Sequence, residues 1–539
     1  MKIGFFLRTV KLFTAKHAVN RLVIHRSTFC SHYSPPTYKL TTFARDSYSN
    51  FQSSLQKMGV NKMDYDAVVV GSGPNGLSAA ITMQQAGLSV LLVEAKNSIG
   101  GGLRSAELTL SHFIHDVCSA IHPLATASPF FKTLPLEQHG LEFIFPTIAA
   151  AHPFDDGNAA ALYSSLEQTA QTLGEDETTY LKLMKPLVQD WPLIAPEILR
   201  PLQFPKHPMA MARFGFKALT SANHLAKRFH SAAAKGLWAG MAAHSIQSLS
   251  NAASSASALV LMAAGHVTGW PMAKGGANSI ANVLASYFVS LGGVIETNFY
   301  VRSLNQLPSS RAVLFDVTPR QLLQIAGHKF SSIYKWQLER YRYGMGVFKI
   351  DWALDGPIPF TASACRQAGT VHIGNTLEEI AASEQLTAEG KFSEKPFVLL
   401  AQQSLFDASR APEGKHTAWA YCHVPNGSQT DMTKQIEKQV ERFAPGFRER
   451  IIGRHVMNTA QLEEYNPNYI GGDIVGGTMD LGQLFTRPAL RLSPYKTSAK
   501  GIYICSSSTP PGAGVHGMCG YHAAKRALKD VFNKKAARL

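Results

Sequence analysis

Apolar and polar positions in residues 64–95 follow the two periods expected of a strand, a helix and a second strand. The short apolar run at residues 66–70 (DAVVV) predicts a buried parallel strand. Residues 77–87 (LSAAITMQQAG) carry apolar positions at helical spacing, and Gly87 ends that pattern. Residues 89–95 (SVLLVEA) predict the second strand. This order is typical of a βαβ unit in an α/β sheet.

Glycines occupy the turn between the first strand and the helix. Gly71, Gly73 and Gly76 have G-x-G-x-x-G spacing. The first permits a tight turn, the second lets the backbone approach a pyrophosphate, and the third lets the helix pack close to the strand. Pro74 and Asn75 lie in the same turn, where the helix N-terminus faces the phosphates with its positive dipole end. We therefore predict that these five residues bind a dinucleotide.

Two further features specify which dinucleotide is expected. Glu94 ends the second strand, 18 residues after Gly76, where an acid can hold the ribose hydroxyls of an adenosine. It argues against a 2′-phosphate but does not separate NAD from FAD. The following GGGLRS is a second glycine turn, with Gly101, Gly102, Arg104 and Ser105 as candidate cofactor contacts. It resembles the turn that lies along FAD in amine-oxidase-type flavoenzymes, and an Arg can bind phosphate by charge-assisted hydrogen bonds. We predict FAD.

The C-terminal region contains a second glycine cluster. The pattern predicts a strand at residues 501–505, a Gly/Pro loop at 506–517 and a helix at 518–532. Helix N-terminal amides near residues 515–518 are expected to face the flavin and to stabilise negative charge on it. The predicted contacts are Gly514, Val515, His516 and Met518. His516 is the candidate acid or base, because an imidazole exchanges protons near neutral pH. The alternative for His516 is a histidine that braces the loop.

The middle of the chain predicts helices and a basic, apolar surface. Residues 176–202 read as helices that Pro186, Pro192 and Pro196 interrupt. From Ile198 to Ile295 there is no Asp or Glu, while eight cations alternate with large apolar residues. This pattern suits a face that rests on anionic lipid. The alternative is a helical cap with a solvated basic face, and no nucleic-acid motif is present. Residues 375–395 are predicted to be a solvated surface insertion.

Charge and cysteine usage bear on the cellular location and on whether a metal site or redox disulfide is present. Residues 1–62 carry ten Lys or Arg and one acid, against a net charge of +15 for the whole chain of 539 residues. This composition suits a mitochondrial transit peptide, and the alternative is a misassigned start in a cytoplasmic bacterial protein. The six cysteines include no C-x-x-C pair. No metal site or redox disulfide is expected.

Several segments together resemble the phytoene-desaturase-like flavin oxidoreductases. Besides the two glycine turns these are HDVCSAIHPLATASPFF, GWPMAKGGANSIANVLASYFVSLGGVI, VLFDVTPRQ, YGMGVFKIDWALDGPIP and TPPGAGVHGMCGYHAA. The resemblance implies a discontinuous Rossmann-type FAD-binding domain (residues 63–150, 265–330 and 490–539). It also implies a mixed α+β substrate domain (151–264 and 331–489). It places Lys274 in a loop beside the cofactor and Val301 on a strand that flanks the adenine. The alternatives are a surface lysine and an ordinary strand residue.

The predicted activity follows from these features. We expect an FAD-dependent oxidoreductase that moves a hydride between an apolar, polyene-like or lipid-like substrate and flavin N5, with an unknown electron acceptor. Peripheral membrane contact is expected, and no nucleic-acid partner. The alternatives are a redox-neutral flavin isomerase and a flavin-containing interaction protein without turnover. Three residues that follow the second glycine turn could line the cavity or brace its loop: His115, Asp116 and His122. Further candidates for the chemistry are His244, Asp351, His372 and Tyr469.

Overall fold

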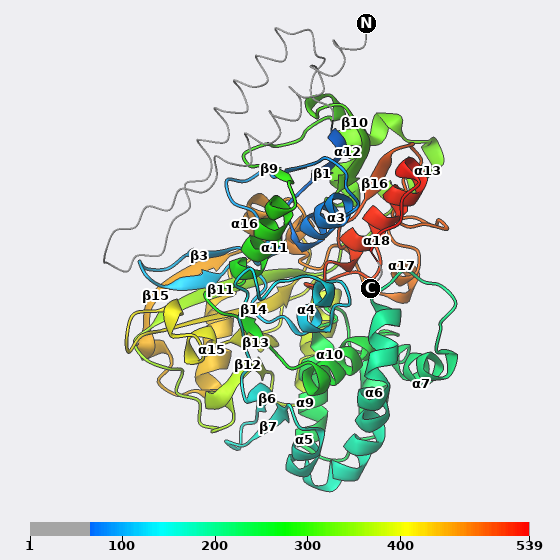
Figure 1. Cartoon of the computed structure of the whole chain (residues 1–539). Coiled ribbons are helices and arrows are strands. Elements are labelled where there is room, and N and C mark those ends of the chain that lie inside the picture. The colour runs from blue at the N-terminus through cyan, green and yellow to red at the C-terminus, as the bar shows by residue number, and fades with distance from the viewer. Residues whose placement is uncertain (1–64, 538) are drawn as a thin grey trace, which may run out of the picture. The chain divides into compact units, whose positions relative to one another are not determined.

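The structure is a computed structural model that describes residues 65–537 and 539. The predictions that concern the basic extension at residues 1–62 lie outside the described residues. Figure 1 shows two large sheets with helices on their faces. In this view the first sheet and its helices lie in the upper part of the coloured chain, and the second sheet lies at the lower left.

The first sheet has five parallel strands that come from distant parts of the chain. Val68 pairs with Val313 on one side and with Leu91 on the other. The strands at residues 65–70 and 90–93 consist almost entirely of buried apolar residues, as expected for a parallel sheet covered on both faces. The strand order is β16 (Ile502–Ile504), β10 (Ser310–Phe315), β1 (Tyr65–Val70), β2 (Val90–Val93) and β9 (Val294–Glu296).

Helices cover both faces of this sheet. On one face α3 (Pro74–Gln85) packs between α11 (Asn278–Ser290) and α18 (Met518–Ala527), and their apolar residues form one core with β1. On the other face α12 (Pro319–Ala326) and α13 (Ser332–Glu339) pack against β1 and β10. A Cβ added to Gly520 of α18 would overlap the Asn75 carbonyl oxygen, so glycine lets α18 approach the first turn of α3.

Local differences from the predicted elements have simple causes. Helix α3 begins at Pro74, three residues earlier than predicted, because proline is favoured at the first helical position. Helix α18 ends at Ala527, and the predicted helix continues only as a wider turn over Leu528–Phe532. Strand β9 ends at Glu296, so the prediction of Val301 on a strand is wrong, although Val301 is buried in the segment that follows.

The second sheet has seven strands and is antiparallel except for one pair. Only β6 and β12 run parallel, with Ala150 opposite Thr370. The order is β15 (Ile451–Met457), β11 (Gly346–Leu354), β14 (His416–Val424), β13 (Val398–Ala401), β12 (Ala368–Ile373), β6 (Ile148–Pro153) and β7 (Ala159–Tyr163). The domain boundary predicted at residue 150 therefore runs through β6.

A helical layer covers one face of the second sheet. Its core joins apolar residues of this layer to β6, β7, β13 and β14. The layer consists of α5 (Leu166–Thr172), α6 (Glu177–Ile198), α7 (Pro208–Ala218), α8 (Ala222–Ala226), α9 (Ala232–Ala243), α10 (Ser255–Val267) and α14 (Leu377–Ala388). The opposite face packs against α15 (Thr433–Phe443).

Helix α6 corrects the prediction of interrupted helices. It runs for 22 residues through Pro186, Pro192 and Pro196. Its buried face, which includes Leu187 and Trp191, packs into the helical layer. Each proline removes one backbone donor, but burial of the apolar face outweighs that loss.

The remaining elements are short. They are α4 (Pro123–Ala127), α16 (Thr459–Tyr465), α17 (Leu481–Leu484) and two small sheets, β3 (Ser105–Glu107) with β4 (Ile114–Asp116) and β5 (Phe143–Ile144) with β8 (Met272–Ala273). Among residues 65–537, none of the helices is both long enough and apolar enough to cross a membrane.

Candidate dinucleotide site and adjoining cavity

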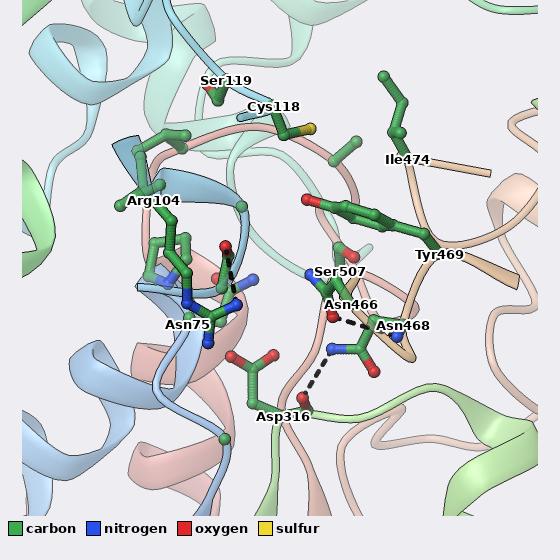
Figure 2. A pocket seen from close by; sticks show the side chains of 18 of the residues that line it. Asn75, Arg104, Cys118, Ser119, Asp316, Asn466, Asn468, Tyr469, Ile474 and Ser507 are labelled. Carbon is green, nitrogen blue, oxygen red and sulfur yellow. Dashed lines mark hydrogen bonds between the residues drawn. The ribbon is translucent and has the colours of Figure 1, made fainter. Parts of the chain in front are cut away.

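One cavity of about 590 Å³ connects the glycine turns of the first sheet with the inner face of the second sheet. Its walls come from the loop after β1, the turn after β2, the loop before α18 and the strands β12, β13 and β14. Figure 2 shows Asn75, Arg104 and Asp316 on one side of this cavity and Tyr469 and Ile474 on the other. Segments more than 400 residues apart in sequence therefore form one site.

The first glycine turn has the close approaches that its motif predicts. A Cβ added to Gly76 would overlap the Gly71 carbonyl oxygen, so α3 can start this close to β1 only with glycine at that position. Gly71 has φ of 100°, which is unfavourable for other residues. Gly73 caps α3 without a side-chain hydrogen bond, and Gly73, Pro74 and Asn75 line the cavity.

The second glycine turn lies directly against the first. A Cβ added to Gly101 would lie 3.1 Å from the Gly73 Cα, and one added to Gly102 would lie 2.5 Å from the Tyr469 Oη. Gly101, Gly102 and Arg104 all line the cavity. The two turns thus form one backbone-walled cleft at the N-terminus of α3.

Glu94 organises the residues between the two turns. Its carboxylate accepts hydrogen bonds from the backbone N–H groups of Ser72 (3.0 Å) and Lys96 (2.9 Å). The Arg104 guanidinium pairs with the same carboxylate at 2.9 Å. Arg104, predicted as a phosphate contact, is therefore bound to the predicted ribose-binding acid, and both line the cavity.

Asp316 is a site residue that the motif analysis missed. It follows the last residue of β10, and its Oδ2 accepts a hydrogen bond from the Gly76 N–H at 2.9 Å. Burial raises the pKa of Asp316 to about 7; the Gly76 hydrogen bond opposes this shift and the nearby Glu94 adds to it. The sequence signal was present, because polar residues that end adjacent parallel strands lie at one edge of the sheet.

The far end of the cavity is apolar and aromatic. The Trp419 and Tyr421 rings stack with centroids 5.6 Å apart, and Trp270 Nε1 donates to Thr370 Oγ1 at 2.9 Å. Ile121, Leu261 and Leu399 are further apolar residues of this wall. Among the described residues that line the whole cavity, the only carboxylates are Glu94 and Asp316, and both lie at the glycine turns.

His244 contributes a polar group to this apolar wall. Its Nε2 lies 2.9 Å from the Nε2 of His372, which is fully buried. Burial lowers the pKa of His244 to about 3, and it also lowers the pKa of His372. Both imidazoles are therefore neutral near pH 7, and the N–H of one donates a hydrogen bond to the other.

Buried polar residues beside the cavity hold its loops. Asp116 pairs with the Arg410 guanidinium at 3.0 Å and accepts hydrogen bonds from the Ser105 hydroxyl and the Ala277 N–H, both at 2.7 Å. His122 lines the cavity, and burial lowers its pKa to about 4. Asp116 therefore braces the loop, whereas His122 belongs to the wall.

The surface insertion predicted at residues 375–395 contains a buried acid. Helix α14 carries Glu384, which is fully buried and bonds to His423 Nδ1 at 2.7 Å. The polar composition of the segment gave no indication that one face of α14 is buried. The segment is thus part of the helical layer rather than a solvated insertion.

The structure brings most of the predicted cofactor contacts together. The predicted residues that line the cavity are Gly71, Gly73, Pro74, Asn75, Glu94, Gly101, Gly102, Arg104, Val301, Gly514 and Val515. Of the others, Gly76 serves close packing, Ser105 bonds to Asp116, and Met518 is a core residue at the start of α18.

Two predicted residues lie elsewhere, for clear reasons. The Lys274 ammonium is exposed and pairs with Glu142 at 2.9 Å, which corrects its placement beside the cofactor. His516 is fully buried behind the cavity wall, and its Nδ1 accepts a hydrogen bond from the Met518 N–H. Burial lowers the pKa of His516 to about 4. This placement supports the bracing alternative for His516 rather than the acid or base.

Comparisons with known proteins agree with this geometry. The NAD(P)-binding Rossmann-like domain family matches residues 69–134. Pyridine nucleotide-disulfide oxidoreductase domain-containing protein 2 of Rattus norvegicus is 24% identical over an alignment of 564 positions, which covers 88% of this chain and 95% of that protein. A solved variant of putrescine oxidase has a TM-score of 0.58 at 15% identity, over 87% of this chain and 99% of that one.

The predicted resemblance to the phytoene-desaturase-like flavin oxidoreductases is confirmed. The chain has the Rossmann-type fold of solved amine-oxidase-type flavoenzymes such as putrescine oxidase and cyclohexylamine oxidase. A shorter match joins it to one component of the limonene dehydrogenase of Castellaniella defragrans, which is 28% identical over 141 residues, 26% of this chain and 25% of that protein. The resemblance named from several short segments thus extends over most of the chain.

Proposed function

We propose that this protein is an FAD-dependent oxidoreductase that removes a hydride from a neutral, apolar substrate. The observation that carries the proposal is the continuous cavity, which joins two glycine turns to an aromatic wall without carboxylates. The residues at the glycine turns fit the cofactor. A Cβ on Gly73 would lie 2.7 Å from Asp316 Oδ2 and one on Gly101 would lie 3.1 Å from the Gly73 Cα, so glycine at both positions lets the two turns meet and leaves backbone for a phosphate to approach.

Each part of the cleft has a proposed role. The N-terminus of α3 with Gly73 and Asn75 holds the diphosphate, because helix N-terminal amides favour anions. Glu94 holds the ribose and Val301 contacts the adenine. Bound FAD supplies a two-electron acceptor for the hydride. The apolar and aromatic wall at the far end of the cavity keeps water from the substrate.

The apolar wall selects the substrate. A positively charged amine gains no ion pair there, because both carboxylates of the cavity lie at the glycine turns. A neutral hydrocarbon or lipid is stabilised by burial against Trp270, Trp419 and Leu399. The neutral His244–His372 pair offers a hydrogen-bond partner for one polar group of the substrate. The limonene dehydrogenase relative is named for a neutral hydrocarbon, which supports this class of substrate.

Anaerobic mixing of the FAD-loaded protein with two classes of substrate tests the proposal. Limonene and long-chain prenyl alcohols are expected to bleach the visible flavin absorbance, whereas putrescine and cyclohexylamine are expected to leave it unchanged. Bleaching by the amines alone would contradict the proposal. Substrate conversion without bleaching would favour the redox-neutral isomerase, and binding without conversion would favour the interaction protein.

We also propose that the segment from residue 202 to residue 219 rests on an anionic lipid surface. Leu202, Phe204, Met209 and Phe216 are each at least 75% exposed. Lys206 is exposed between them, and Arg213, also exposed, pairs with Asp190 of α6 at 2.8 Å. No acid occurs from residue 198 to residue 295. Apolar side chains beside cations match the chemistry of an anionic membrane surface. An apolar substrate dissolved in lipid would then be available to the enzyme.

The basic extension at residues 1–62 supports a proposal for localisation. We propose that it directs the protein to mitochondria, because it is basic and poor in acids. The test is to fuse residues 1–62 to a fluorescent reporter. Mitochondrial import of the reporter is expected, and a cytoplasmic reporter would contradict the proposal.

A further inference from the structure

The Asp316 carboxyl group contacts the turn at residues 73–76, where the diphosphate of FAD is proposed to bind. Its Oδ2 accepts the Gly76 N–H at 2.9 Å, and a Cβ on Gly73 would lie 2.7 Å from the same oxygen. Gly76 belongs to the first turn of α3, whose amides attract anions. Asp316 itself lines the cavity, and Figure 2 shows its carboxyl group directed toward Asn75 and Arg104. A carboxyl group and a diphosphate would therefore share one helix terminus.

No cation compensates this carboxyl group among the described residues. The Arg104 guanidinium, which lines the same cavity, is bound to Glu94. The other titratable groups that influence Asp316 are Glu94 and the buried thiols of Cys505 and Cys519. Cys505 follows β16 and Cys519 lies on α18, and burial raises both thiol pKa values, so both are neutral near pH 7.

We propose that this site binds FAD together with one proton, which Asp316 holds as a neutral carboxylic acid. The inference rests on the proposed FAD site and concerns the protonation of that site. An ionised Asp316 would repel the two negative charges of the diphosphate in a poorly hydrated cleft. The neutral acid still accepts the Gly76 N–H with one oxygen and can donate its O–H to a phosphate oxygen. No bond to carbon changes, and the proton comes from solvent.

The sign of the pH dependence follows from linkage. The pKa of Asp316 without ligand is raised to about 7, and the bound diphosphate raises it further. Below pH 7 the carboxyl group is already protonated, so FAD affinity is constant. Above pH 7 each binding event must take up a proton. The Kd therefore rises roughly tenfold per pH unit until the pKa of the complex is reached.

Titration of the full-chain apoprotein with FAD, followed by quenching of flavin fluorescence between about pH 6 and pH 8.5, tests the inference. We expect the wild-type Kd to rise by at least about tenfold over this range. Asp316→Asn keeps the hydrogen bond from Gly76 but cannot ionise, so its Kd should stay near the wild-type value at low pH. Asp355→Asn, at an exposed carboxylate that pairs with Lys415, is the matched control and should follow the wild type.

Calorimetry of the wild type gives a readout that needs no variant. Binding enthalpies in two buffers of different ionisation enthalpy should show proton uptake near pH 8 and little near pH 6. A Kd independent of pH, together with no proton uptake, would overturn this inference and leave the proposed function intact. Failure of FAD to bind at every pH would overturn the proposed function and this inference with it.

Discussion

Several glycines are essential to this site because they have no side chain. Gly73, Gly76 and Gly101 each occupy a position where a Cβ would meet backbone or Asp316. The glycine motifs were sufficient to predict these three positions, because their spacing is typical of turns that approach a dinucleotide. Asp316 could not be predicted in the same way, since its carboxyl group meets Gly76 across 240 residues of sequence.

Substitution of Gly73 tests the cleft at this scale. Gly73→Asp would place a second carboxylate beside Asp316 and where the diphosphate is proposed to bind, so FAD content should fall at least about tenfold. Absorbance per protein after purification measures it. Gly215→Asp is the control, since a Cβ at Gly215 of α7 meets nothing within 4 Å. Normal FAD content in a folded Gly73→Asp variant would show that the diphosphate lies elsewhere.

Helices pack closely on strands in this fold where the helix carries glycine at the contact. Gly236 and Gly240 of α9 and its C-cap residue His244 follow one another at intervals of four residues. A Cβ on Gly236 would lie 2.7 Å from the His152 ring, and one on Gly240 would lie 2.7 Å from the His372 Cβ. Those histidines, His152 and His372, come from β6 and β12. The residues that α9 contacts could not be predicted, because they lie on strands distant in sequence. Tertiary packing also explains why α6 continues through its three prolines, although the local sequence predicts interruptions there.

A pair of glycine-to-alanine substitutions separates packing from helix propensity. Gly240→Ala would place a Cβ 2.7 Å from the His372 Cβ, so the free energy of unfolding should fall by about 1–3 kcal/mol. Gly215→Ala lies in an open part of α7 and should raise it by up to about 1 kcal/mol. Urea denaturation monitors both variants. A Gly240→Ala variant more stable than wild type would mean that α9 does not pack closely on His372.

The whole molecule joins two sheets through one cavity. The five-stranded sheet was foreseeable from its glycine fingerprint and from the resemblance to a known family. The seven-stranded sheet was not, because its strands lack a motif and its single parallel pair, β6 with β12, joins distant segments. The apolar wall needs both sheets, so the side chains that select the substrate could not be chosen from sequence alone.

Vesicle binding tests the proposed membrane contact of the whole molecule. The wild type should co-sediment with phosphatidylglycerol vesicles more than with phosphatidylcholine vesicles, and less at high salt. Phe204→Ser with Phe216→Ser should weaken this binding roughly tenfold or more, because both rings lose apolar burial. Ile333→Ser removes an equally exposed apolar side chain from α13 and should have no effect. Equal binding of the double variant and the wild type would contradict the assignment of this surface.

The central claim is that the two glycine turns hold FAD. Its most direct test is the visible absorbance spectrum of the purified full-length protein, with the released cofactor identified by chromatography. We predict a yellow protein that releases FAD in a ratio near one per chain. A colourless protein that cannot be reconstituted with FAD would contradict the account.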